Sequence, residues 1–490
     1  MSAADAAFNA AIAALRAGEE DYGLHALAPV LADYPGDARL WQAAGLLHRQ
    51  IEELEPAIAA LAEAARLDPG NALIAHSLAR AHLEAGLPAV GLFRAAQRLA
   101  PQDGGLFLGL VAALEEDEGP AAALSELEHM LSGWPTWIPG IEAVTRLRWQ
   151  CGDVGNFSAF ERALAREPRN IDLWRSFVVT LTQADLYEAT LTAVFDGRKA
   201  AGPQLLFDAN EAVARAELGQ SEAAEALFAR LAGLDDDTVK VRYVRHLLRT
   251  GRPEDAAREA EAAARGAQPH FFWPYVATAW RLTGDARWEW LEGDPRLVGV
   301  YDLADRLPPL PALAGRLRSL HRTSHQPLEQ SVRGGTQTQG ALFSRIEPEI
   351  RALRAAVVAA VEAHVAQLPP PDPAHPTLSV RRDGRIRFSG AWSVRLTGGG
   401  HHANHIHPMG WFSSALYVVL PGEEGGGERP AGWLTLGEPQ KEIGLDLPPF
   451  RTVEPKPGRL VLFPSTMWHG TVPFAAGERL TVAFDIAKPA

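Results

Sequence analysis

The chain has 490 residues, which is too long for one ordinary hydrophobic core and indicates roughly two to four domains. Its formal net charge is −13 and it has no basic block, so neither a nucleic-acid backbone nor an anionic membrane surface is expected as its main partner. The single cysteine, Cys151, excludes an intramolecular disulfide framework, and no stretch approaches the roughly 20 apolar residues that span a bilayer. The first residues also lack the basic and apolar regions of a secretion signal. We therefore expect a soluble cytoplasmic protein.

Prolines recur at a nearly fixed interval through the first half of the chain, among residues that favour helices. Successive differences are 34, 32, 34, 33, 35 and 66 residues, for Pro35, Pro69, Pro101, Pro135, Pro168, Pro203 and Pro269. The last difference is two steps of 33, and GLDDD (233–237) occupies the intermediate turn. A period near 34 predicts a helix-hairpin repeat.

One unit of this repeat extends from Trp41 to Pro69. Small residues on both predicted helices allow the helices to approach closely, namely Ala44, Gly45, Ala57 and Ala64. Trp41 and Leu61 fill the seam between them, and Pro69 ends the second helix. The unit resembles the tetratricopeptide repeat, although Ala44 and His48 replace the Leu and Tyr of that pattern.

Later units keep parts of the same pattern. The next one has Ala89, Phe93, Ala96 and Pro101, and Trp174 opens another. The resemblance implies an all-α tetratricopeptide-type solenoid over residues 1–280, with a concave face that binds a peptide or protein. The alternative is an array that serves only as a scaffold or in the assembly of a homo-oligomer.

The pattern changes near residue 281. The stretch LPPLPAL (307–313) predicts an extended, polyproline-like backbone, and we assign residues 281–326 to a connector. A polar, glycine-broken stretch follows, and IEPEIRALRAAVVAAVEAHVAQL (346–368) then predicts an amphipathic helix that ends at Pro369.

Short runs of β formers, separated by Gly and Pro, follow these prolines. They are AWSVRL (391–396), WFSSALYVVLP (411–421), GWLTLG (432–437), GRLVLFP (458–464) and RLTVAFDI (479–486). Several short strands with turn signals predict a sandwich or barrel.

Four histidines lie within seven positions between the first two runs: His401, His402, His405 and His407. Histidine is the commonest neutral metal ligand, and a His-x-His pair on an extended strand points both rings to one face. The third ligand is easiest to place at His469, 62 residues beyond His407. Ten residues later comes Arg479, whose guanidinium can grip a carboxylate with two hydrogen bonds.

This layout resembles that of the iron(II)- and 2-oxoglutarate-dependent oxygenases, which have His-x-(Asp/Glu), a distal His and an Arg or Lys ten residues later. The segments QSVRGGTQT, WSVRL, HIHPMGW, LFPSTMWHGTVPF and RLTVAFD are similar to a bacterial branch related to prolyl hydroxylases and often joined to tetratricopeptide repeats. The resemblance implies a jelly-roll (double-stranded β-helix) oxygenase domain over residues 327–490, with Fe(II), 2-oxoglutarate as cosubstrate, and O2.

The resemblance also implies roles for individual residues. His405 would be the first iron ligand, His469 the distal ligand and Arg479 the partner of the far carboxylate of 2-oxoglutarate. Thr481 points to the same face as Arg479 and would add a hydroxyl. Tyr417 is a second candidate donor.

His407 stands where the superfamily has Asp or Glu. An imidazole can complete a facial set of three nitrogens, but it removes one negative charge and so should weaken iron binding. We expect His405, His407 and His469 all to bind the metal, and the alternative is that His407 lies behind the ligands or contacts substrate.

Other polar residues are weaker candidates. His401 is expected in an exposed loop, and His402 stays open between a loop residue and a contact behind the ligands or with substrate. Five residues could line the pocket, although most are expected on exposed faces: Arg333, Gln337, Arg387, Trp392 and Arg395.

We therefore expect a 2-oxoglutarate-dependent dioxygenase that hydroxylates a peptide or protein side chain presented by the repeat array. One alternative keeps this chemistry and makes the substrate a free amino acid or another small metabolite. Another alternative is a metal-binding scaffold without enzymatic activity.

Overall fold

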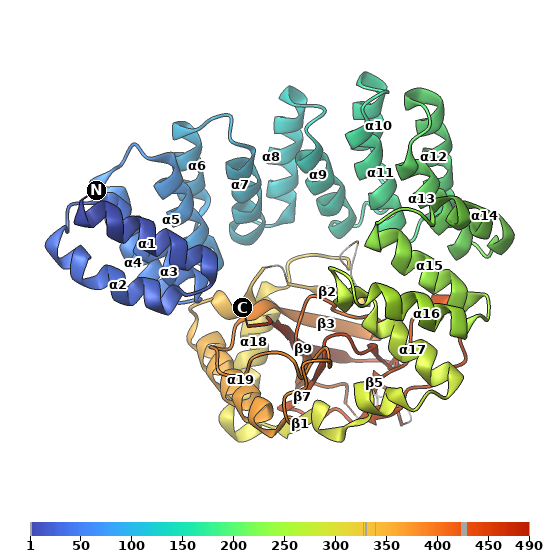
Figure 1. Ribbon diagram of the computed structural model, residues 1–490. Helices are drawn as coiled ribbons and strands as arrows, with labels where there is room; N and C mark the ends of the chain where they lie inside the picture. The colour runs from blue at the N-terminus through green and yellow to red at the C-terminus, as the bar shows by residue number, and fades with distance from the viewer. Residues whose placement is uncertain (1, 327, 329–330, 339, 423–428, 490) are drawn as a thin grey trace.

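The computed structural model describes residues 2–326, 328, 331–338, 340–422 and 429–489. A helical array forms an arc in the first half of the chain, and two β-sheets with their covering helices lie inside the arc (Figure 1). Within the described ranges, no helix is both long enough and apolar enough to cross a membrane.

Consecutive helices of the array pack side by side in pairs. In chain order they are α1 (Ala3–Ala17), α2 (Glu20–Asp33), α3 (Ala38–Gln50), α4 (Leu54–Leu67), α5 (Ala72–Glu84), α6 (Val90–Leu99), α7 (Gly104–Asp117), α8 (Pro120–Gly133), α9 (Ile138–Gln150), α10 (Ser158–Arg166), α11 (Ile171–Gln183), α12 (Tyr187–Ala201), α13 (Leu205–Glu217), α14 (Ser221–Leu231), α15 (Asp237–Arg249), α16 (Pro253–Ala263) and α17 (Trp273–Thr283). The first six prolines of the period lie in the turns that follow the even-numbered helices from α2 to α12. The predicted all-α repeat solenoid is confirmed.

Local chemistry explains why each unit begins and closes where it does. Two residues after four of the prolines, an Asp or Asn side chain accepts backbone N–H bonds at the start of the next helix: Asp37, Asn71, Asp103 and Asn170. Gly45 allows α3 and α4 to touch, because a Cβ there would lie 2.5 Å from Cγ of Leu61. Trp41 and Trp174 each donate from Nε1 to the carbonyl of the proline six residues earlier, at 2.9 Å. These recurring contacts tie each unit to its own turn.

The β domain consists of two antiparallel sheets, with strand orders β1-β7-β4-β9-β3-β2 and β6-β5-β8. The strands are β1 (Gly299–Asp302), β2 (Val332–Gln337), β3 (Phe388–His402), β4 (Phe412–Val419), β5 (Leu434–Leu436), β6 (Arg451–Val453), β7 (Arg459–Pro464), β8 (His469–Thr471) and β9 (Glu478–Ile486). The five predicted runs correspond to β3, β4, β5, β7 and β9. The predicted β-sandwich is confirmed.

Two helices, α18 (Leu310–Leu320) and α19 (Pro348–Gln367), cover the large sheet. Leu313 of α18 and Val357 of α19 belong to one buried cluster with Leu416 and Val482 of the sheet. The amphipathic pattern at 346–368 therefore correctly predicts a helix, and its apolar face forms the core of the domain.

The segment 281–326 differs from the predicted extended connector. It contributes β1, which pairs with β7 in the large sheet, and it contains α18. Pro311 lies in the first turn of α18, where a missing N–H removes no helical hydrogen bond. The prolines thus mark the start of a helix whose Leu313 and Leu317 are buried against the sheet. The domain boundaries themselves stay a prediction.

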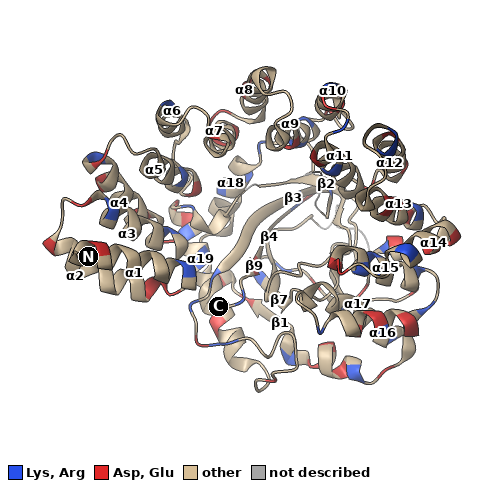
Figure 2. Cartoon of the chain, turned by 45° about the horizontal axis from the view of Figure 1, so that its top comes forward, with Lys and Arg blue, Asp and Glu red and all other residues tan. Residues whose placement is uncertain are grey.

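From α1 to α12, the array contacts the β domain through the turns that join the two helices of successive pairs, whereas α15 and α17 contact it through residues of the helices themselves, as Arg245 does with Gln440. In chain order, the turn contacts are Glu20 with Arg387, Glu52 with Arg354 (2.9 Å), the Ala85 carbonyl with the Ile346 N–H (3.2 Å), Glu116 with Arg345 (2.7 Å), the Gln150 carbonyl with the Ser324 N–H (3.2 Å), and Asp185 with Arg333 (3.7 Å). In four of the six, an acid of the array meets an arginine of the β domain. Figure 2 shows this arc of helices around the sheet. The β domain is therefore held along one edge of the solenoid from α1 to α12, and by α15 and α17 at the end of the array.

Candidate metal centre

A cavity between the two sheets collects polar side chains from most strands of the β domain. Its walls are formed by Ser331, Gln337, Trp392, His402, His405, His407, Ser413, Ser414, Ala415, Leu434, Phe463, His469, Gly470, Thr471, Arg479, Thr481, Ala483 and Asp485. Four of them, from Arg479 to Asp485, alternate along β9, because side chains two apart on a strand share a face. The outward-facing Leu480, Val482 and Phe484 are buried in the core instead.

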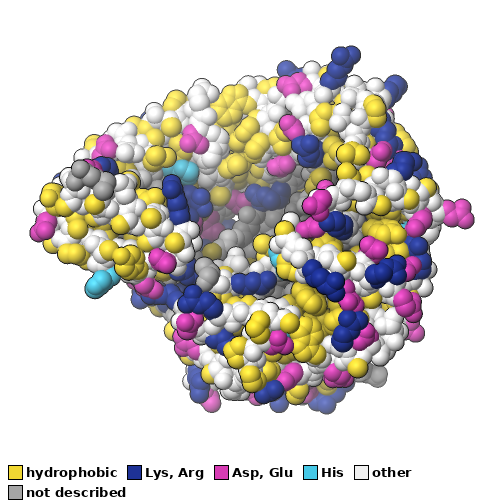
Figure 3. Space-filling model, viewed as in Figure 1, with side chains coloured by type: hydrophobic (Ala, Val, Ile, Leu, Met, Phe, Trp, Pro, Cys, Tyr) yellow, Lys and Arg dark blue, Asp and Glu magenta, His cyan; other side chains and the backbone are white. Residues whose placement is uncertain are grey.

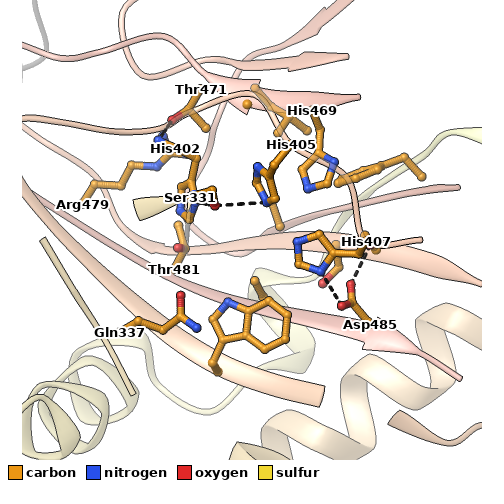
Figure 4. Close-up of a pocket in the computed structure, with 18 residues that line it drawn as sticks. Ser331, Gln337, His402, His405, His407, His469, Thr471, Arg479, Thr481 and Asp485 are labelled. Atoms are coloured by element: carbon orange, nitrogen blue, oxygen red, sulfur yellow. Dashed lines mark hydrogen bonds and ion pairs between the residues drawn. The ribbon is translucent and has the colours of Figure 1, made fainter. Parts of the chain in front are cut away.

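Three histidines converge in this cavity. His405, His407 and His469 each offer one ring nitrogen, and these atoms lie within 4.8 Å of one another (Figure 4). Backbone bonds fix two of them, because the N–H groups of His405 and His469 donate to each other's carbonyls at 2.9 and 3.0 Å. β3 ends at His402, so the His-x-His pair follows that strand and is not part of it, contrary to the expected extended strand.

Hydrogen bonds assign the same tautomer to all three rings. Nδ1 of His405 contacts the Ala403 carbonyl at 2.8 Å, and Nδ1 of His469 contacts the Met467 carbonyl at 3.0 Å. Nδ1 of His407 contacts Oδ2 of Asp485 at 2.5 Å. A carbonyl or carboxylate oxygen only accepts, so each Nδ1 must donate and each Nε2 keeps its lone pair. Two of these lone pairs come from the segment after β3 and one from β8, and together they suit a metal ion.

Burial keeps the rings of His405 and His469 neutral. It lowers the pKa of His405 and His469 well below the ordinary histidine value, and the neighbouring histidines lower both further. Trp392 stacks on His407 with ring centres 5.5 Å apart, and Phe463 lies against His469 at 4.6 Å. Aromatic rings thus cover two of the three histidines.

Arg479 lies in the same cavity and is almost completely buried, with 2% of its surface exposed. Its Nε and Nη1 have no hydrogen-bond partner in the described part of the chain, and neither has the phenol oxygen of Tyr417. The guanidinium lies 5.0 Å from the centre of the Tyr417 ring. Burial lowers the pKa of Arg479 and raises that of Tyr417. A buried cation without a partner is unfavourable, so these groups form a ready site for an anion.

The remaining predicted residues are placed as follows. Thr481 lines the cavity beside Arg479, and Tyr417 contacts Arg479 with its ring although it does not line the cavity itself. Gln337, Trp392 and His402 also line it, and Nδ1 of His402 lies 3.2 Å from the Ser331 hydroxyl. Three others lie elsewhere: Arg395 pairs with Glu478, Arg387 with Glu20 of the array, and His401 contacts the Gly399 carbonyl.

Sequence reasoning missed several groups in the cavity, above all Ser331, Ser413 and Asp485. The signal for Asp485 was present in RLTVAFD, where it continues the alternation that begins at Arg479 and Thr481. Ser331 carries no comparable signal, although its hydroxyl lies 3.2 Å from Nε2 of His405.

A larger cleft of about 1060 Å³ begins at Ser331, His405, His407 and Asp485 and extends to the array. Tyr187 of α12 and Arg242 of α15 line its array side, and Met409 lines its β-domain side. Arg333 also lines this cleft. Figure 3 shows that the surface is hollowed between the array and the β domain.

Comparison with known proteins agrees with this site. Residues 390–485 match the model of a family described as a putative 2OG-Fe(II) oxygenase, where 2OG is 2-oxoglutarate. This range includes His405, His407, His469, Arg479 and Asp485. None of the curated proteins compared with the chain matches it.

Solved structures with matches to the chain contain helical repeats. An O-GlcNAc transferase mutant from Thermobaculum terrenum is 24% identical over 27% of this chain and 26% of its own, with a TM-score of 0.25. MamA from Desulfovibrio magneticus RS-1 is 16% identical over 35% of this chain and 98% of its own (TM-score 0.30), and a tetratricopeptide repeat protein from Parabacteroides merdae is 12% identical over 49% and 97% (TM-score 0.30). This chain thus spans about a quarter of the transferase's length. At these scores, the solenoid assignment rests on the helix pairs themselves.

Proposed function

We propose that this chain, in which a helical repeat array precedes a putative 2OG-Fe(II) oxygenase segment, is an Fe(II)- and 2-oxoglutarate-dependent hydroxylase of peptide or protein side chains. The observation that carries the proposal is the pairing, within one cavity, of three convergent histidine nitrogens with the buried guanidinium of Arg479, whose Nε and Nη1 have no hydrogen-bond partner in the described residues. A cytoplasmic location, which the sequence predicts, belongs to the same proposal.

The residues of the cavity fit both the metal and the cosubstrate. His405, His407 and His469 would hold Fe(II), for which neutral imidazoles are suitable ligands. Arg479 would hold the far carboxylate of 2-oxoglutarate, with the Thr481 hydroxyl beside it. When bound, iron and 2-oxoglutarate supply the oxidation: O2 converts 2-oxoglutarate to succinate and CO2, and one oxygen atom enters a C–H bond of the substrate.

The chain itself positions these groups and keeps water away. The carbonyls of Ala403 and Met467 and the carboxylate of Asp485 hold the three rings in the tautomer that leaves Nε2 free. The Ser331 hydroxyl, 3.2 Å from Nε2 of His405, would give up this contact when the nitrogen binds a metal. Trp392 and Phe463 provide apolar cover over two of the rings.

The size and position of the cleft favour a chain segment as substrate. Its volume of about 1060 Å³ is at the upper end of the roughly 300–1000 Å³ of typical small-molecule pockets, which leaves room for several residues of a peptide. It opens at His405 and His407, and helices α12 and α15 of the array form one of its walls. Because successive turns of the array hold the β domain, the array would present substrate through this cleft and not through the edge that these turns occupy.

Anaerobic titration of the metal-free protein with Fe(II) and then 2-oxoglutarate tests the proposal. We expect the visible charge-transfer band that forms when a keto acid chelates iron. It should be lost in His469→Ala and kept in the matched control His401→Ala, since His401 lies off the cavity wall. A wild-type protein that binds Fe(II) but gives no band would overturn the hydroxylase proposal and leave a metal-binding scaffold.

The choice between a peptide and a metabolite needs a point variant, because deleting repeats would also remove the turns that hold the β domain. We propose Tyr187→Ala on the array wall of the cleft, assayed by succinate formation with a mixed peptide library and, separately, with free amino acids. A peptide substrate predicts slower peptide-dependent turnover with unchanged 2-oxoglutarate binding. If free amino acids support succinate formation, and the rate is the same in the wild type and in Tyr187→Ala, the substrate is instead a metabolite.

A further inference from the structure

The three histidines bring no negative charge to the metal centre, but one of them, His407, is hydrogen-bonded to a carboxylate. We propose that Asp485 supplies this charge through His407 and is a positioning residue for metal binding. This inference rests on the proposed function, in that it assumes a divalent metal at the three nitrogens.

Asp485 is held from two sides. Its Oδ2 accepts from Nδ1 of His407 at 2.5 Å, and its Oδ1 accepts from the Ser413 hydroxyl at 2.6 Å. The Ser413 oxygen lies 3.0 Å from the Ser465 hydroxyl, so a chain of hydrogen bonds continues behind the carboxylate. With both oxygens engaged, the carboxylate has one orientation, and it fixes the plane of the His407 ring.

Among the described residues, no Lys or Arg forms an ion pair with this carboxylate. Asp485 has 9% of its surface exposed, and in the described part of the chain its ion-pair partner is His407. A buried carboxylate is unfavourable unless a positive group faces it. An imidazole that binds a divalent metal through Nε2 carries part of the metal's charge, so metal binding provides the partner that Asp485 otherwise lacks.

The other two rings are treated differently. Nδ1 of His405 and Nδ1 of His469 donate to neutral backbone carbonyls, of Ala403 and Met467. Among the three, only His407 donates to a charged acceptor. It is also the residue that stands where the oxygenase pattern has an Asp or Glu. The negative charge is thus displaced one side chain outward from the metal.

An amide separates charge from orientation. Asp485→Asn keeps an oxygen that can accept from His407 and removes the negative charge. We expect the dissociation constant for Fe(II) alone, measured anaerobically by competition with a chelator, to rise by about 10- to 100-fold. Ser413→Ala is the matched control, because it removes a hydrogen bond to the same carboxylate but leaves its charge, and we expect a rise of only a few-fold.

A double-mutant cycle tests whether the charge acts through His407. In a His407→Ala background, Asp485→Asn should change Fe(II) affinity by less than about 2-fold, because the relay is already broken. An equal effect in both backgrounds would overturn the relay. Unchanged affinity in both Asp485→Asn and Ser413→Ala would overturn the inference as a whole, and Ser413→Ala carries the test if the asparagine variant does not fold.

The outcome is distinguishable from failure of the proposed function. If the wild-type chain binds no Fe(II), the metal centre itself is wrong. If it binds Fe(II) and forms the charge-transfer band, while Asp485→Asn binds Fe(II) equally well, only the role of Asp485 is wrong.

Discussion

The repeat array and the cavity of the β domain each contain a buried arginine, but the first arginine has hydrogen-bond partners at its guanidinium and the second has unpartnered nitrogens in the described residues. Arg245 of α15 has 5% of its surface exposed and donates to Glu217 at 2.7 Å and to Gln440. Arg479 of β9 has 2% exposed, and its Nε and Nη1 have no partner in the described residues. Buried polar groups in proteins are normally paired, so the unpaired one marks where a ligand belongs.

Histidines of the β domain repeat this contrast. His375 is buried with both nitrogens engaged: Nδ1 accepts from the Thr377 N–H at 3.0 Å, and Nε2 donates to the Trp290 carbonyl at 3.1 Å. His405 and His469 have Nδ1 fixed by a carbonyl, and their Nε2 atoms face the other ring nitrogens of the cluster. A histidine with two partners is part of the framework, whereas one with a directed lone pair is available for chemistry.

The largest effect is expected from the paired arginine. Arg245→Met leaves the buried Glu217 with Arg249 as its one remaining close cationic partner in the described residues and also removes the contact with Gln440, so the free energy of unfolding should fall by about 3 kcal/mol. Binding of 2-oxoglutarate to the folded variant should not change. Denaturant unfolding of the metal-free chain measures the first quantity, and a loss of under about 1 kcal/mol would show that the pair is not what stabilises α15.

The unpaired arginine should give the opposite result. Arg479→Met removes a buried charge that nothing in the described chain neutralises, so the metal-free protein should become more stable by about 1–3 kcal/mol. Affinity for 2-oxoglutarate should fall by roughly 100-fold, about 3 kcal/mol, because the carboxylate loses its partner. The two quantities are measured by denaturant unfolding and by the charge-transfer titration. A destabilised variant with normal cosubstrate affinity would contradict the anion site.

A buried histidine away from the cavity predicts a pH dependence of stability. His364 of α19 contacts the Tyr301 hydroxyl at 2.9 Å, and burial lowers its pKa from 6.5 to about 4. Between these pH values the unfolded chain binds a proton that the folded chain does not, so lowering the pH from 6.5 to 4 destabilises the fold, by roughly 2–3 kcal/mol from this group.

The control for this effect is His364→Gln, which does not titrate. In denaturant unfolding of this variant, we expect the free energy of unfolding to fall less steeply over the same pH range. The difference in slope should correspond to the uptake of one proton fewer on unfolding. An unchanged slope would assign the acid sensitivity to other groups, such as His321, whose pKa burial also lowers to about 4.

Local signals made much of the fold predictable. The repeat was visible because each unit carries its own proline, cap and small residues, and β3, β4, β5, β7 and β9 were visible because each is a distinct run of β formers. Strands β1, β6 and β8 have only three or four residues and, unlike the equally short β5 in GWLTLG, do not lie in a run of β formers bounded by glycines on both sides. Pro311 misled because a proline is equally suited to a linker and to the first turn of a helix.

The candidate site was predictable only where its members share a short motif or a fixed offset. His405, His407, His469 and Arg479 follow such offsets, whereas Asp485 meets His407 across 78 residues and Ser331 meets His405 across 74. The acids that hold the β domain, such as Glu20 and Glu52, look in the sequence like ordinary surface charges of a helix turn. Strand pairing and docking bring these groups together, and neither leaves a local pattern.

The smallest effect is expected where both partners of an ion pair are exposed. Arg351 and Glu55 pair at 2.9 Å across the array and the β domain, but their side chains remain 57% and 58% exposed. Water screens such a pair, so Arg351→Ala should lower the free energy of unfolding by less than about 1 kcal/mol. The pair Arg354 and Glu52, 28% and 16% exposed, lies in the same interface, and Arg354→Met should cost more because it leaves a more buried carboxylate unpaired. Equal losses for the two variants, by denaturant unfolding at matched salt, would show that burial does not decide what these charges contribute.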